Sequence, residues 1–541
     1  MPRLSRRSVA TPGLLLPTSR RGLLRTGVLG GGTVMLGLGA AALFPKPSLA
    51  KLRDTAPVVT HGVQSGDIGL DSGVVWARAD RPARMIVDYA LTESFKDSKR
   101  QIGPAALQDT DFTARLQLGD LPAGQDVFFK VTFQDLGDLQ SLSEPVIGRF
   151  RTAPGALRDV TFIWGGDVVG QGWGINPAIG GMTIWKEMAN LQPDFFIHSG
   201  DSIYADGVLK DQVTLPDGSI WKNVTSEEKS KVAETLDEYR GNYKYNLLDE
   251  NLRGFNATVP ILAQWDDHET RNNWYPNQIL DDDRYKIKSV ALLSANAGRA
   301  WHEYMPLRLD AQRADQVYRV IHYGPSLDVF MLDQRSYRGD NSRNRQDKLG
   351  PDSAFMGAEQ IRWLKQQLLA SKATWKVLAS DMPISLVVPD PLKDGTENYE
   401  AIANRDNGAP LGRELEIADL LRFMKQNGVK NTVWLTADVH YTAAHYYDPD
   451  KAQFQDFEPF WEFVSGPINA GTFGPNELDA TFGPQLKFQK APDQGQANLS
   501  PAAEMQFFGH VKIDAATEVM TVTLKDLKNR DLYKVDLPPV V

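Results

Sequence analysis

Short apolar runs that end abruptly in polar residues recur four times between residues 160 and 440. These runs are FIWGGD, ending at Asp167; PDFFIHSGD, ending at Asp201; ILAQWDDHE, which contains Asp267 and His268; and TVWLTADVH, which ends in Asp438 and His440. Short apolar runs of this kind predict buried strands. Carboxylates and imidazoles at the ends of four such strands are expected to converge in the crevice where a sheet opens. The pattern therefore predicts one metal site.

The chain before these runs is predicted to be all-β. Between Val58 and Thr152, the runs GVVWARA, MIVDYAL, FTARLQL, VFFKVTF and IGRFRTA alternate apolar and polar residues and are separated by Gly, Pro and Asp turns. This spacing is typical of an immunoglobulin- or fibronectin-like sandwich, which we place at residues 57–153. Because the segment contains no cluster of ligand residues, a scaffold role is favoured over contact with carbohydrate or cell wall.

After Thr152, strand-like runs alternate with helical ones, which predicts an α/β domain over residues 158–541 with two stacked mixed sheets flanked by helices. Helices are expected over residues 227–246 and 359–372, and a final hairpin over residues 510–527. The polar stretch from 208 to 223, with a Pro-Asp-Gly turn, is expected to form a rim loop.

The amino-acid composition limits the class of protein and the possible metal ligands. The 541 residues suggest two to three domains, and 42% hydrophobic with 23% charged residues indicate a packed core. The formal net charge of −9 argues against a general nucleic-acid binder. The chain has no cysteine, so a metal must be held by oxygen and imidazole ligands, with tyrosinate as a further option.

The N-terminal residues resemble an export signal. Residues 19–25 form a twin-arginine pattern, residues 27–44 are rich in Gly, Ala and Leu, and Ser-Leu-Ala at 48–50 is a plausible cleavage site. A membrane anchor is the alternative, although the run is short and glycine-rich for a stable span. We therefore expect a signal peptide over residues 1–50, the twin-arginine export machinery as a partner, and a periplasmic or secreted protein without a stable membrane span.

The four strand ends suit a site for several cations, which needs carboxylates to offset the positive charge. Asp167, Asp201, Asp267 and Asp438 would supply them. His268 would act as a nitrogen ligand or as a proton donor. Asp438 and His440 would point the same way if their strand continued, because strand side chains alternate.

Several motifs resemble those of the PhoD-like alkaline phosphatases and phosphodiesterases, within the calcineurin-like metallophosphoesterase superfamily. They are GDxxY at 200–204, WDDHE followed by Asn-Asn at 265–273, LDQRSYR at 332–338 and ADVH at 437–440. The stretches between them, including HEYMP at 302–306, resemble the same family. The resemblance extends over nearly the whole chain after the signal.

The resemblance implies a metallophosphoesterase core behind an immunoglobulin-like domain, holding one ferric and two calcium ions. By this resemblance Asp201 bridges two ions, Tyr204 is a tyrosinate on iron, and Asp438 and His440 are a late ligand pair. Asp267 takes the place of an asparagine in the wider superfamily and is followed by His268. The iron-binding cysteine of described members is replaced by Asp167, and no C-terminal lid helix is evident.

These observations lead to the hypothesis of an exported, metal-dependent phosphatase or phosphodiesterase. A metal-bound hydroxide would attack phosphorus, with Asp201 and His268 as the catalytic residues. Arg335 and Asn272 are candidate substrate-binding residues, although Arg335 could equally be a structural partner of Asp333. The substrates would be small phosphate esters or phosphodiester polymers, without nucleic-acid binding. Two alternatives remain: a non-catalytic, calcium-dependent cell-envelope binding protein, and another metal-dependent reaction on this scaffold.

Overall fold

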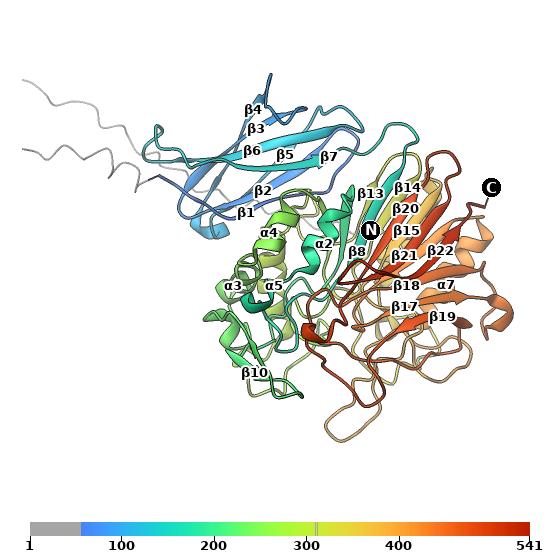
Figure 1. The fold of residues 1–541 in the computed structure, drawn as a ribbon. Helices are drawn as coiled ribbons and strands as arrows, with labels where there is room; N and C mark the ends of the chain where they lie inside the picture. Colours follow the sequence, from blue (N-terminus) through green and yellow to red (C-terminus); the bar gives the residue numbers. More distant parts are fainter. Residues whose placement is uncertain (1–55, 309, 311, 541) are drawn as a thin grey trace, which may run out of the picture. The chain divides into compact units, whose positions relative to one another are not determined.

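The computed structural model describes residues 56–308, 310 and 312–540 (Figure 1). The predicted signal peptide therefore lies outside the described residues. Within the described part of the chain, no helix is both long and apolar enough to cross a membrane.

The first large sheet has nine strands among the described residues. In spatial order they are β22 (Asp531–Leu537), β21 (Met520–Asp526), β20 (Phe507–Ile513), β8 (Val160–Gly165), β9 (Phe195–Ser199), β12 (Ile261–Gln264), β1 (Val59–Gly66), β2 (Gly73–Ala79) and β5 (Thr113–Leu118). Strands β8, β9 and β12 pair in parallel, so their carboxyl ends reach the same edge of the sheet. Strands β20 and β21 form the predicted final hairpin.

The second large sheet has seven strands in the same part of the chain. Their order is β13 (Arg319–His322), β14 (Leu327–Met331), β15 (Trp375–Ala379), β16 (Thr432–Thr436), β18 (Phe460–Val464), β17 (Thr442–Tyr447) and β19 (Pro484–Lys490). Strands β14, β15, β16 and β18 are parallel. The end of β16 is thus available to meet the ends of β8, β9 and β12.

Helices cover the outer faces of both sheets. Apolar side chains of α2 (Ile184–Asn190), α3 (Leu236–Asn246), α4 (Glu250–Asn256) and α5 (Val290–Tyr304) pack with those of the first sheet. Those of α6 (Gly357–Ala370) and α7 (Glu414–Gln426) pack with the second sheet. The short 3₁₀ helices are η1 (Gln108–Thr110), η2 (Pro177–Ile179), η3 (Glu228–Ser230), η4 (Pro351–Ser353), η5 (Pro449–Lys451) and η6 (Pro501–Ala503).

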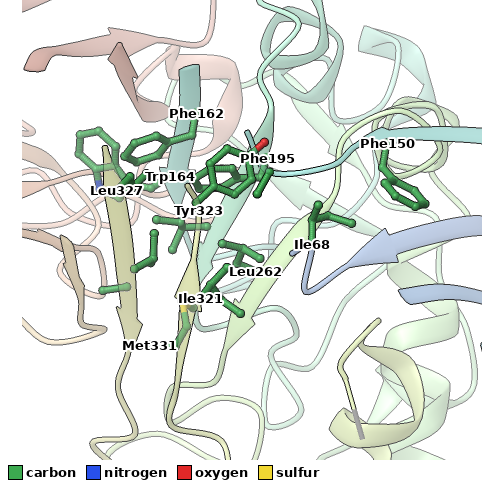
Figure 2. Packing of buried hydrophobic residues seen from close by; sticks show 14 of the residues in the cluster. Ile68, Phe150, Phe162, Trp164, Phe195, Leu262, Ile321, Tyr323, Leu327 and Met331 are labelled. Atoms are coloured by element: carbon green, nitrogen blue, oxygen red, sulfur yellow. The ribbon is translucent and has the colours of Figure 1, made fainter. Parts of the chain in front are cut away.

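The core lies between the sheets, and alternation along each strand divides the side chains between the two faces. Phe162 and Trp164 of β8 pack in the layer that faces the second sheet, whereas Ile163 packs with the helices. Figure 2 shows this inner layer, in which the rings of Phe195 and Tyr323 lie 4.6 Å apart. Burial on both faces explains why these strands read as continuous apolar runs.

The predicted sandwich is present, with two strands more than the five runs suggested. Its outer sheet contains β4 (Lys99–Ala106), β3 (Ala83–Ala90), β6 (Asp126–Asp135) and β7 (Val146–Arg151). The facing strands β1, β2 and β5 also belong to the nine-stranded sheet, because β1 pairs with β12 at Gly66 and Ile261. The expected fold class is confirmed, namely an α/β core preceded by an all-β sandwich, and the two share one sheet.

Two local predictions need correction. The helix expected over residues 227–246 begins only at Leu236, because Thr235 and Glu238 form a capping box there. The expected rim loop at residues 208–223 instead contains a hairpin of β10 (Gln212–Thr214) and β11 (Ile220–Lys222). The Pro-Asp-Gly turn falls between these two strands, as its turn chemistry requires.

Candidate metal centre

The predicted carboxylates meet at a cleft of about 650 Å³. Asp167, Asp201 and Asp267 lie in the turns after β8, β9 and β12 of the first sheet, and Asp438 follows β16 of the second. Asp201, Asp267 and Asp438 line the cleft, whereas Asp167 lies beside His440, which also lines it. Both sheets therefore contribute to one site.

Sharp backbone turns place these side chains. Asp167, Asp201, Asp438 and His440 all have left-handed backbone conformations, with φ between 49° and 67°. Gly200 has φ 91°, and a Cβ atom there would lie 2.4 Å from the Cβ of Asp266. Residues held in such sparsely populated conformations cluster at functional sites.

The ligand-type atoms form three groups, in each of which they all lie within 4.8 Å of one another. The groups are Asp167, Asp201 and His440; Asp201, Asp267 and His268; and Asp266, Asp267 and Asp438. Asp201 and Asp267 each belong to two groups. A carboxylate shared in this way is suited to bridge neighbouring cations.

In the first group, hydrogen bonds orient His440. Its Nδ1 donates to the carbonyl oxygen of Gly471, which can only accept. The Nε2 atom lies 2.8 Å from the Tyr204 hydroxyl and 3.7 Å from Asp167 Oδ1. The Nε2 lone pair is thus directed at Tyr204 and Asp167, two of the other predicted ligands, in the arrangement typical of a metal-binding histidine.

In the second group, Asp206 orients His268. The His268 Nδ1 donates to Asp206 Oδ1 at 2.6 Å, and Nε2 lies 3.9 Å from Asp267 Oδ1. The His268 ring also packs against Tyr204, with the ring centroids 4.1 Å apart. Although burial opposes it, the carboxylates of Asp206 and Asp267 raise the pKa of His268 to about 9.

The electrostatics of the site favour added cations. Burial, with the neighbouring carboxylates, raises the pKa of Asp167, Asp201 and Asp438 well above its usual range. Asp167 Oδ2 and Asp267 Oδ1 are buried without a hydrogen-bond partner, which is costly for a carboxylate oxygen. A donor set of carboxylates, imidazole and phenol fits hard or borderline metal ions.

Arg335, a candidate for substrate binding, is not brought to the cleft. Its side chain has no exposed surface, and its guanidinium pairs with Asp266 and Glu400. The alternative is that Arg335 is a structural partner of Asp333. The two residues do interact, but Asp333 accepts a hydrogen bond from the backbone N–H of Arg335 and not from its side chain. In this structure, Arg335 lies behind the acidic cluster.

Asn272 does line the cleft, as expected of a substrate-binding residue. Its backbone N–H donates to Asp206 Oδ2 at 2.9 Å. Neighbouring Asn273 donates its backbone N–H to Asp267 and its side-chain amide to Asp390. The Asn-Asn pair therefore also fixes the carboxylates behind it.

The condition under which Asp438 and His440 would point the same way, a continuing strand, is not met. Strand β16 ends at Thr436, and the backbone then turns through the left-handed region at both residues. Alternation no longer applies there, and the two side chains join different groups. Strand periodicity predicted the proximity of these ligands but not their directions.

Two residues that support the site were not singled out from the sequence. Asp206 holds His268, and Glu269 accepts from the backbone N–H groups of Asp201, Ser202 and Asp266. Glu269 ends the WDDHE motif, and Asp206 follows the GDxxY motif by two residues. Acidic residues next to predicted ligands were the available signal, since such ligands need hydrogen-bonding support.

The comparisons with known proteins agree with this geometry. Residues 162–524 match the PhoD-like phosphatase family, and residues 46–154 match the PhoD-like phosphatase N-terminal domain. The chain belongs to the PhoD-like phosphatase family. It is 28% identical to alkaline phosphatase D of Bacillus subtilis (strain 168) over 444 residues, covering 77% of this chain and 70% of that protein.

Solved structures of PhoD-like and related phosphatases share the fold. A structure of PhoD is similar with a TM-score of 0.65 at 22% identity, covering 88% of this chain and 93% of the other. The purple acid phosphatase PPD1 from yellow lupin (Lupinus luteus) seeds is similar with a TM-score of 0.53 at 11% identity, covering 89% and 74%. This PhoD-like protein is a metal-dependent phosphatase, and nothing in these comparisons favours a non-catalytic binding protein.

Proposed function

We propose that this PhoD-like protein is an exported phosphatase and phosphodiesterase that holds one ferric and two calcium ions. The observation that carries the proposal is the set of buried carboxylates from both sheets, in which Asp167 and Asp267 each have an oxygen without a hydrogen-bond partner. Buried carboxylates that lie close together are stabilised by bound cations. The cleft beside them has room for a substrate.

The three groups suggest how the ions are divided. Asp167, Asp201, Tyr204 and His440 offer the phenol and imidazole that suit a ferric ion. Asp267 and Asp438 belong to the carboxylate-rich groups, and carboxylate oxygens are the ligands that calcium prefers. Asp201, shared between groups, would bridge.

When bound, such cations polarise a phosphoryl oxygen and bring the pKa of water near 7. The chain itself positions the reacting groups. Asp206 fixes the His268 ring through Nδ1, which leaves Nε2 directed to the cleft. His268 thus donates its Nε2–H to a phosphoryl oxygen or to the leaving oxygen. Asn272, at the cleft wall, offers its side-chain amide to the phosphate.

Export is supported by the twin-arginine pattern at residues 19–25. Because that pathway carries folded proteins, the metal site would be loaded before export, and the enzyme would act in the periplasm or outside the cell. Changing both Arg20 and Arg21 to Lys is expected to leave the protein in the cytoplasm. Export at the normal level after that change would exclude the twin-arginine route.

The test combines elemental analysis with hydrolysis of 4-nitrophenyl phosphate and bis(4-nitrophenyl) phosphate. We expect iron and calcium, and activity that a chelator removes and re-added metal restores. The Asp456→Asn variant is the matched control, because Asp456 is a half-exposed carboxylate paired with Arg422 and Lys425. Bound metal without hydrolysis of either ester would contradict the proposal, and calcium without iron would contradict the ion assignment.

A further inference from the structure

Arg405 is the one lysine or arginine among the described residues that line the cleft. Its side chain is 52% exposed, and its Nε lies 2.9 Å from Oε2 of Glu477, which is 51% exposed and lines the same cleft. Half-exposed ion pairs contribute little to stability. The pair can therefore open at little cost.

The backbone that carries Arg405 is fixed, in contrast to its side chain. Arg405 has φ 67°, in the left-handed region. On either side of it, the backbone N–H of Asp406 donates to Asn404 Oδ1 at 2.8 Å, and that of Gly408 donates to Asp406 Oδ1 at 2.8 Å. The amide of Asn404 is in turn bonded to buried Glu414. A strained residue held by its surroundings is characteristic of a ligand-binding position.

Glu477 sits on an equally well-held segment. Its carbonyl oxygen accepts from the backbone N–H of Val387 at 2.9 Å, and neighbouring Asn476 donates to the Val387 carbonyl at 2.9 Å. Two anchored segments thus face each other at the cleft, joined by a carboxylate on a guanidinium. Glu477 occupies Arg405 in the way that an anionic group of a ligand would.

The other residues that line the cleft show why the positive charge of Arg405 is important for substrate binding. Asp201, Asp267 and Asp438 make one part of the cleft strongly acidic, and the lining also includes the apolar side chains of Val387 and Phe473. Cations held by these carboxylates would bind the scissile phosphate. A second negative charge on the substrate then has Arg405 as its one permanently charged partner along the described lining.

We propose that Arg405 is a specificity-determining residue that binds a second anionic group of the substrate, displacing Glu477. This deepens the proposed function and rests on it. The group is a carboxylate or a phosphate-type anion, since guanidinium binds both through two parallel hydrogen bonds. No bond is made or broken at Arg405, and it acts only in binding.

The test uses three 4-nitrophenyl phosphodiesters with the same leaving group, in which the second alcohol is propyl and ends in a hydroxyl, a carboxylate or a phosphonate. For the wild type, we expect a lower KM for the two charged substrates than for the hydroxyl one. Arg405→Gln should reduce this charged-to-neutral ratio of kcat/KM about fivefold or more, mainly through KM. Arg405→Lys should restore part of it, and Glu477→Gln should increase it.

Arg422→Gln is the matched control, because Arg422 forms a similar half-exposed pair with Asp456 and does not line the cleft. Comparison of the carboxylate and phosphonate substrates identifies the preferred anion. A ratio that stays within about twofold in Arg405→Gln, while all three esters are still hydrolysed, would overturn this inference and leave the phosphatase function intact. Absence of hydrolysis of every ester by the metal-loaded wild type would instead contradict the proposed function.

Discussion

Two clusters of buried charge lie next to each other in this PhoD-like protein, and only one is neutralised by the protein itself. The acidic cluster consists of Asp167, Asp201, Asp267 and Asp438, which belong to overlapping ligand groups. Behind it, Arg335 forms ion pairs with Asp266, Glu400 and Asp381. Arg335 also lies 3.8 Å from Asp438 Oδ1, so the two clusters are in contact.

The arginine cluster pairs buried carboxylates with guanidinium groups of the protein itself. Arg338 pairs with Glu400 and donates to its carbonyl oxygen. Arg413 donates to the backbone carbonyls of Glu400 and Ala401, and both guanidinium groups lie over the Phe355 ring at 4.7 and 5.4 Å. Buried guanidinium groups are retained when carboxylates, carbonyls and an aromatic face surround them.

The acidic cluster has no comparable set of partners. Burial and the neighbouring carboxylates raise the pKa of Asp167, Asp201 and Asp438 in this cluster. This difference indicates that the arginine cluster stabilises the fold and that the acidic cluster forms the functional site. A buried cluster neutralised from within holds the structure, whereas one left acidic is prepared for metal ions.

The largest expected effect is at the shared carboxylate of the acidic cluster. Asp201→Asn is expected to lower kcat about a thousandfold or more and to remove bound metal, because two ligand groups lose a common charge. Elemental analysis and a phosphatase assay on the same preparation test this. Full activity with metal retained would contradict the bridging role.

A substitution in the arginine cluster should lower the stability of the protein. Arg335→Met is expected to reduce the free energy of unfolding by about 3–5 kcal/mol, because it removes the guanidinium partner of buried Asp266 and Asp381. Urea denaturation followed by tryptophan fluorescence measures it. Arg343→Met is the control, because the exposed Arg343–Glu397 pair should contribute less than about 1 kcal/mol. Equal effects of the two changes would refute the structural role of the cluster.

Removing the charge that orients His268 should lower kcat by an intermediate factor. Asp206→Asn preserves the shape of the residue that holds His268 Nδ1 but removes its charge. We expect kcat to fall about 10–100-fold with metal content little changed, because Asp206 belongs to none of the three ligand groups. The exposed Asp211→Asn change serves for comparison. If kcat is unchanged in Asp206→Asn, His268 does not depend on this carboxylate.

The smallest effect concerns the residue that replaces the cysteine expected from family resemblance. Asp167→Cys offers a softer thiolate in the first group. The ratio of iron to calcium should rise, with turnover changed by less than about tenfold because the other ligands remain. Elemental analysis and the visible absorption of the protein would show this. An unchanged metal ratio would mean that Asp167 does not contact the ion.

Much of the fold can be predicted from the sequence. The buried strands around Phe162 and Phe195 appear as apolar runs, because both faces of a parallel sheet are covered. The helix predicted to end at Asn246 begins later than its helical periodicity suggests, because the capping box at Thr235 sets its first turn. Strand periodicity does not apply at Asp438, because β16 ends at Thr436 and the backbone leaves the strand.

The sequence by itself determined the fold class and the ligand types, because periodicity and residue chemistry are local properties. Only the tertiary structure decided how these ligands divide into groups and which charges the protein neutralises internally. Asp266 and Asp267 are adjacent in the chain, yet Asp266 pairs with Arg335 while Asp267 faces the cleft. The direction of a side chain after a strand end depends on the turn and on long-range packing, and local patterns do not encode either one.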